Sequence, residues 1–142
     1  MHSGERDERA IRDLIERYAD AVNRRDAAAW AALWTADGVW EVFGSAIPGR
    51  YAVLGAWSAA LKGFAFVFHV SHSAVIELAG DTARARWTIS EQLVDARGRA
   101  SLLLALYHDQ YCREAGAWRI ARRRLEPLYQ GPPDLSGALP GA

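Results

Sequence analysis

The hydrophobic positions change period once along this chain, from the spacing of a helix to that of strands. Between residues 5 and 24 the apolar side chains recur every three or four positions, which predicts an amphipathic helix. These side chains are Ile11, Leu14, Ile15, Tyr18, Ala19 and Val22. Asp26 offers an N-cap for a second, alanine-rich helix ending near residue 35. A short strand at 39–43, a loop at 44–49 and a third helix at 50–61 should follow.

From residue 64 the pattern is that of long strands joined by tight turns. We expect strands over 64–79, 82–95, 100–113 and 117 to about 129, with Gly80-Asp81 as the first turn. Helices followed by a run of strands predict an α+β fold, with three N-terminal helices packed on a curved, mostly antiparallel sheet. This domain should span 1–130, and residues 131–142 should form a loosely ordered tail rich in Pro and Gly.

Some of the strands are apolar on both faces. Leu102, Leu104 and Leu106 alternate with Leu103, Ala105 and Tyr107. An antiparallel sheet that is buried on both sides needs a second cover besides its helices. We therefore expect a homodimer that forms through the outer face of the sheet.

Composition narrows the classes of partner. Seventeen basic and seventeen acidic residues give a net charge of zero, so nucleic acid and anionic membranes are not expected as partners. The N-terminus is charged where a signal peptide would be apolar, and no apolar run approaches the roughly 18 residues of a membrane span. A cytoplasmic location is the expectation. Cys112 is the only cysteine, and no cluster of metal ligands is visible, so no metal site is expected.

The segment "FVFHVSH", residues 66–72, contains two histidines three positions apart. On a strand, neighbouring residues point to opposite faces, so His69 and His72 face different sides. If His69 faces the interior, Val67, Ser71 and Ser73 join it, whereas His72 faces the outer side and a partner subunit. His69 is then either a hydrogen-bonded core residue or a group that transfers protons.

The order of elements and several local words resemble the SnoaL-like proteins of the nuclear transport factor 2-like superfamily. The resemblance rests on "AIRDLIERYADAVNRRDAAAWAALWTADGVWE", "HVSHSAVIEL" and "REAGAWRIARRRLEP", and covers residues 7–128. It implies a cone-shaped α+β barrel with an internal cavity. The superfamily includes ketosteroid isomerases, scytalone dehydratases and dehydrochlorinases, which work without a cofactor.

The resemblance places particular residues at functional positions. His69 matches the histidine of the dehydratases and dehydrochlorinases, and Tyr18 matches the first-helix tyrosine of the isomerases. Asn23 stands where the histidine's partner is an aspartate, and Val42 stands where related enzymes keep an acid or a phenol. Asn23 should still orient the imidazole by a hydrogen bond, although it adds no charge.

Strand parity adds further candidates. Tyr107 and Asp109 share a face of the fourth strand, which the resemblance makes the inner one, and Glu91 shares a face with Trp87 on the third. Asp109 is either a cavity acid or half of a buried polar pair. Trp40 and Trp87 should line an apolar ligand pocket. The basic run 122–124 should form a solvated strand face; the alternative is that Arg122 turns inward toward an anionic group.

The leading hypothesis is a cofactor-independent acid/base enzyme that acts on a small apolar, cyclic, polyketide-like or terpenoid-like molecule. The reaction would be a dehydration, isomerisation, cyclisation or elimination, with His69, Asn23, Tyr18 and Asp109 as catalytic groups. Tyr107, Trp40, Trp87, Val42 and Glu91 would contact the substrate. The rival hypothesis is a non-catalytic small-molecule-binding or dimerisation domain, which the missing acids at Asn23 and Val42 favour.

Overall fold

The computed structural model describes residues 3–141, so residues 1, 2 and 142, at the ends of the expected domain and tail, lie outside the described residues. In chain order the elements are α1 (Ser3–Arg24), α2 (Ala27–Ala31), β1 (Trp34–Val42), β2 (Ser45–Pro48), α3 (Arg50–Lys62), β3 (Phe64–Ala79), β4 (Thr82–Asp95), β5 (Ala100–Glu114) and β6 (Ala117–Gly131). The predicted α+β class is confirmed. The strands expected at 64–79 and 82–95 have the predicted bounds.

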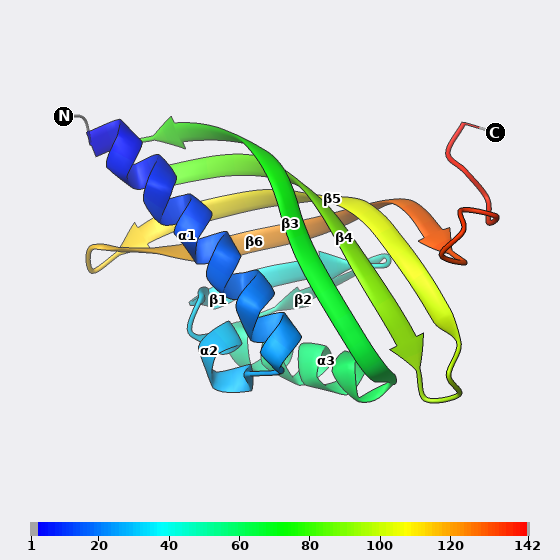
Figure 1. Ribbon diagram of the computed structural model, residues 1–142. Coiled ribbons are helices and arrows are strands. Elements are labelled where there is room, and N and C mark those ends of the chain that lie inside the picture. Colours follow the sequence, from blue (N-terminus) through cyan, green and yellow to red (C-terminus); the bar gives the residue numbers. More distant parts are fainter. Residues whose placement is uncertain (1–2, 142) are drawn as a thin grey trace.

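The six strands form one sheet in the order β2-β1-β6-β5-β4-β3. β1 and β6 run parallel, and every other neighbouring pair is antiparallel. The long strands curve strongly around one side, where α1 lies across them, and the sheet does not close into a barrel (Figure 1). The fold is therefore a cone with an open wall, with α2 and α3 beside β1 and β2.

The helices bury their apolar sides against this concave face. Ile11, Ile15 and Tyr18 of α1 are almost completely buried, as their helical spacing predicts. Asp26 caps α2, because its carboxylate accepts a hydrogen bond from the main-chain N–H of Ala29 at 3.0 Å. No helix between residues 3 and 141 has both the length and the apolar character needed to cross a membrane.

The second helix is shorter than expected, and β1 is longer. The helix ends at Ala31 instead of near residue 35, and β1 already begins at Trp34. The Ile120 N–H donates to the Leu33 carbonyl at 2.8 Å, and Trp34 lies in register with Ile120. Pairing with a strand some 85 positions later thus overrides the local helical pattern.

The expected loop at 44–49 contains a strand, β2, which pairs with β1. Phe43 and Gly44 both have positive φ, 47° and 82°. Positive φ at two central residues is the geometry of a type I′ hairpin turn, which glycine adopts easily. The tight turn returns the chain at once, so Ile47 lies opposite Trp40.

A β-bulge interrupts β3 at His72. Ser71 lies opposite Ile89 and Ser73 lies opposite Thr88, so His72 is an extra residue in β3. Beyond the bulge the faces are exchanged: Ser73, expected inside, is exposed, and Ala74 packs against the core.

The tail folds back on one aromatic side chain. The Tyr129 hydroxyl donates to the Pro132 carbonyl at 2.5 Å and accepts from the Gly137 N–H at 3.1 Å. A Cβ atom at Gly137 would lie 3.1 Å from the same hydroxyl oxygen, so glycine allows this close approach.

Candidate functional site

His69 and Glu91 form a hydrogen-bonded pair on the concave face of the sheet. They are direct cross-strand neighbours on β3 and β4, and His69 Nδ1 lies 2.8 Å from Glu91 Oε2. The imidazole is only 1% exposed, whereas 22% of the Glu91 side chain is exposed. A carboxylate accepts hydrogen bonds only, so Nδ1 carries the proton when Glu91 is ionised. Because Glu91 is the more exposed of the two side chains, solvent or a ligand reaches the carboxylate more easily than the imidazole.

Asn23, near the end of α1, holds the main chain of His69 rather than its ring. Its amide nitrogen donates to the His69 carbonyl at 3.0 Å, and its amide oxygen accepts from the His69 N–H at 2.6 Å. The expected bond between Asn23 and the imidazole is replaced by this two-point clamp. The remaining ring nitrogen, Nε2, lies 3.5 Å from the Ser71 hydroxyl, a weak contact.

A cavity of about 390 Å³ opens beside this pair. Its lining is mostly aliphatic and aromatic, and includes Tyr18, Val42, Trp40, Glu91 and Tyr107 among the residues expected to take part. The other expected residues lie outside the lining: His69 sits behind Glu91, Asn23 binds the main chain, and Asp109 and Trp87 belong to a neighbouring buried network. Val42, in place of an acid, adds to the apolar wall.

The buried network is centred on Arg123. Asp109 accepts from Arg123 Nε at 2.9 Å, and both side chains are fully buried. The Tyr111 hydroxyl also donates to Asp109 and itself accepts from the Trp87 indole at 3.0 Å. Asp109 is thus half of a buried polar pair, one of its two expected alternatives.

Arg123 also connects this network to two tyrosines of the cavity wall. Its guanidinium lies 4.3 Å from the centre of the Tyr18 ring and 3.9 Å from that of Tyr107. Trp40 Nε1 donates to the Tyr107 hydroxyl at 3.1 Å. Both cavity tyrosines are therefore held rigidly, each by the cation–π contact and Tyr107 also by the indole.

Burial governs the ionisation of these groups. Desolvation raises the pKa of Asp109 above its ordinary value, although the positive charge of Arg123 opposes this. Burial alone would lower the pKa of Arg123, but Asp109 and, in smaller part, the three tyrosines around the guanidinium together outweigh burial, so the pKa is raised. Burial also raises the pKa of Tyr18, and that of Tyr107 further. Both phenols therefore stay protonated near neutral pH and can donate hydrogen bonds.

Arg123 is the residue that sequence reasoning missed, because the run 122–124 is predicted to be a solvated strand face, with an inward Arg122 as the alternative. Ile120 lies opposite Tyr111 and Arg122 lies opposite Gln110, so Ala121 is an extra residue in β6. This bulge turns Arg123 inward and leaves Arg122 on the other face, paired with Glu41. A signal was present in the spacing of the buried positions, because Ile120 and Leu125 cannot share a face of an uninterrupted strand.

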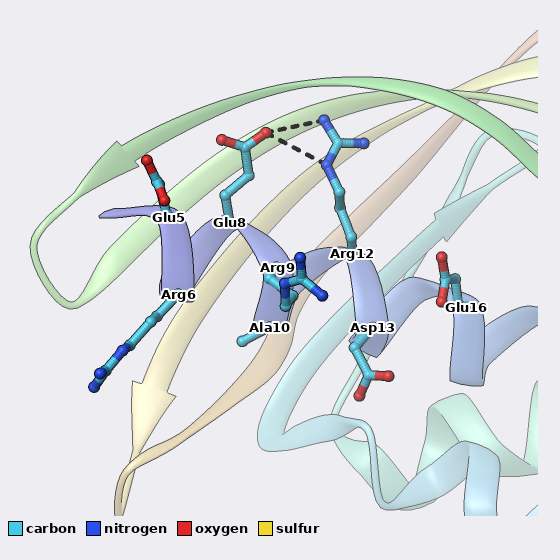
Figure 2. Close-up of a pocket in the computed structure, with 8 residues that line it drawn as sticks. All are labelled: Glu5, Arg6, Glu8, Arg9, Ala10, Arg12, Asp13 and Glu16. Atoms are coloured by element: carbon cyan, nitrogen blue, oxygen red, sulfur yellow. Dashed lines mark hydrogen bonds and ion pairs between the residues drawn. The ribbon is translucent and has the colours of Figure 1, made fainter. Parts of the chain in front are cut away.

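A second hollow runs along the N-terminal half of α1. Figure 2 shows the eight residues that line it, Glu5, Arg6, Glu8, Arg9, Ala10, Arg12, Asp13 and Glu16. All of them come from one helix, and acidic and basic side chains lie side by side, as in the Glu8–Arg12 ion pair at 3.0 Å. Because no other element supplies a wall, this surface does not enclose a ligand. Within residues 3–141 no three potential metal-binding side chains come together.

Comparison with solved structures gives close matches of fold. A protein of unknown function from Mycobacterium tuberculosis, Rv3472, is 30% identical with a TM-score of 0.78, over 85% of this chain and 71% of that one. A hexachlorocyclohexane dehydrochlorinase, LinA-type3 from Novosphingobium barchaimii, is 20% identical with a TM-score of 0.82, over 94% of this chain and 92% of that one. A candidate scytalone dehydratase from Novosphingobium aromaticivorans is 20% identical with a TM-score of 0.83, over 98% and 95%. At 20% identity the likeness to these two shows the fold alone.

The family itself follows from the sequence. No curated protein matches the chain. The family model of the SnoaL-like domain, however, matches residues 5–124, which include most of α1, the His69–Glu91 pair and most of the sheet. The chain therefore belongs to the SnoaL-like family, within the nuclear transport factor 2-like superfamily.

Proposed function

We propose that the protein is a cofactor-independent acid/base enzyme that acts on a small apolar, cyclic molecule bound in the cavity. The single observation that carries this proposal is the His69–Glu91 pair at the wall of an apolar cavity. A carboxylate that lines a cavity and is held by an imidazole is placed to accept a proton from a bound molecule and to return it. Such a pair serves a dehydratase, an isomerase, a cyclase or an eliminating lyase.

The roles differ from residue to residue. Glu91 contacts the substrate, because it lines the cavity. The imidazole of His69 binds Glu91 Oε2 through Nδ1, and the two groups share the proton of this hydrogen bond. Asn23 positions His69 through its main chain. The hydroxyls of Tyr18 and Tyr107 donate to an oxygen of the substrate, and Asp109 supports them indirectly by holding Arg123. Trp40 and Val42 shape the apolar wall, and Trp87 supports Tyr111.

Similar structures favour elimination within this class. One similar protein is a hexachlorocyclohexane dehydrochlorinase, and another is a candidate scytalone dehydratase. Both names describe the loss of a small molecule, hydrogen chloride in the first and water in the second. Removal of a proton by Glu91, with departure of a leaving group on the adjacent carbon, is the corresponding step here.

Ring opening of 5-nitrobenzisoxazole tests the proposal without knowledge of the natural substrate. In this reaction a base removes the one proton on the isoxazole carbon, the N–O bond breaks, and a nitrile and a coloured phenolate form. We expect turnover by the wild-type protein and a loss of about 10²- to 10⁴-fold in Glu91→Gln. His69→Gln should lose activity as well. Chloride release from hexachlorocyclohexane is a second assay.

Glu16→Gln is the matched control, since it makes the same chemical change on the exposed side of α1. It should retain full activity. Full activity in Glu91→Gln and His69→Gln would contradict the assignment of these residues. Tight binding of apolar probes without turnover in any assay would instead support the rival hypothesis, a binding domain.

We also propose that the protein forms a homodimer through the outer sheet face. Phe66 and Phe68 are 51% and 43% exposed there, and their rings stack with centroids 6.5 Å apart. Exposed apolar patches of this kind mark interfaces. Sedimentation equilibrium should show a dimer that Phe66→Ser/Phe68→Ser dissociates, while Tyr51→Ser, an exposed position on α3, leaves it intact. A monomeric wild-type protein would overturn this.

A further inference from the structure

The wall of the cavity contains one acidic side chain and no cationic side chain that could neutralise it. Among the residues that line it, Glu91 is the only one with a charged side chain, and the polar others are hydroxyl, amide and indole groups. Arg123 lies beneath the tyrosine rings, outside the lining, and its charge is already matched by Asp109. A ligand in the cavity therefore meets one acidic side chain and no positively charged side chain.

Glu91 also has an unused hydrogen-bonding capacity. Its Oε2 is bonded to His69, but within the described part of the chain Oε1 has no hydrogen-bond partner. A purely apolar ligand would strip water from this oxygen and offer nothing in return, which is costly. A ligand that donates a hydrogen bond to Oε1 avoids that cost.

The aromatic part of the wall selects among possible donors. The rings of Trp40 and Trp57 line the same cavity, beside those of Tyr18 and Tyr107. The faces of aromatic rings attract cations, and a charged donor bonds a carboxylate more strongly than a neutral one does. Both effects favour an ammonium group over a hydroxyl group and disfavour a carboxylate.

From these contacts we infer that the cavity binds a compact, mainly apolar molecule that carries one amine, with its ammonium group on Glu91 Oε1. The inference rests on the proposed function only in using the same cavity. It holds whether the amine is converted or merely bound.

Three adamantane derivatives test this inference, because they share one apolar cage and differ only in the polar group. They are 1-adamantylammonium, 1-adamantanol and 1-adamantanecarboxylate. Calorimetric titration of the wild-type protein should show the ammonium binding at least about tenfold more tightly than the alcohol. The carboxylate should bind most weakly. In Glu91→Gln the ammonium should bind no better than the alcohol.

Glu16→Gln again serves as the matched control, since it removes the same charge far from the cavity and should preserve the order of affinities. Equal binding of ammonium and alcohol, a preference for ammonium that survives in Glu91→Gln, or no binding of any probe would each overturn the inference. The adamantanes contain no reactive group, so their binding is independent of the ring-opening assay. Ammonium binding without turnover would count against the enzyme alone, and turnover without ammonium binding against the ligand class alone.

Discussion

Asp109 and Glu91 are two carboxylates on the same concave face, but their surroundings differ. Asp109 is completely buried, and its two oxygens are taken by Arg123 and by the Tyr111 hydroxyl. Glu91 is partly exposed in the cavity and has only one oxygen engaged. A buried carboxylate with both oxygens engaged depends on its partners and has no oxygen left for a ligand, whereas one with a free oxygen can receive a hydrogen bond from a ligand. Substitutions in the two regions should therefore separate stability from function.

The largest expected effect on stability is at Arg123. Arg123→Met leaves the Asp109 carboxylate buried without its cation, which should lower the free energy of unfolding by about 3–5 kcal/mol. Denaturation in guanidinium chloride measures this change. The double variant Asp109→Leu/Arg123→Met removes both charges and should recover much of the loss. A single variant as stable as the wild type would contradict the importance of this ion pair.

An intermediate effect is expected at Asn23, which connects the stable core to the cavity. Asn23→Ala leaves the main-chain N–H and carbonyl of His69 without partners and should cost about 1–3 kcal/mol. Asn23→Asp keeps an acceptor for the N–H but has no donor for the carbonyl, so it should recover only part of this. Gln110→Ala, at an exposed position on β5, is the control and should change stability by less than about 0.5 kcal/mol. Equal stabilities of Asn23→Ala and the control would show that the clamp contributes nothing.

The smallest effect is a pH dependence far from both regions. Hydrogen bonds from Arg113 and then from Trp118 lower the pKa of Asp7, which ties α1 to β5 and β6. A lowered folded-state pKa contributes stability that is complete above the ordinary aspartate value of about 3.9 and is lost as the pH falls through the folded-state value. Asp7→Asn should remove this part of the acid dependence while leaving the cavity unchanged. An identical acid unfolding profile in the variant would exclude the contribution.

Local pattern was enough for most of the fold and for part of the site. The bounds of β3 and β4 could be predicted because the turn that joins them depends only on two adjacent residues, Gly80 and Asp81. The start of β1 could not, because its partner β6 lies at the other end of the chain. Likewise the cavity position of Tyr18, Trp40 and Tyr107 followed from periodicity and resemblance. The inward turn of Arg123 depends on a bulge that shifts the face by one residue, for which the sequence contains only an indirect signal.

The bulge at His72 determines which residue lies opposite His69, because its one extra residue shifts the register of β3 against β4. Counting back from the pair Ala79–Thr82, an uninterrupted ladder would set His69 opposite Gln92, an exposed residue of the outer face. Cross-strand neighbours share a face, so His69 would then lie outside the cone beside an amide. One additional residue in β3 turns the histidine inward and gives it an acid as its neighbour. In this protein one extra residue, with no exchange of side chains, makes the difference between a histidine on the outer sheet surface and a histidine–carboxylate pair beside the cavity.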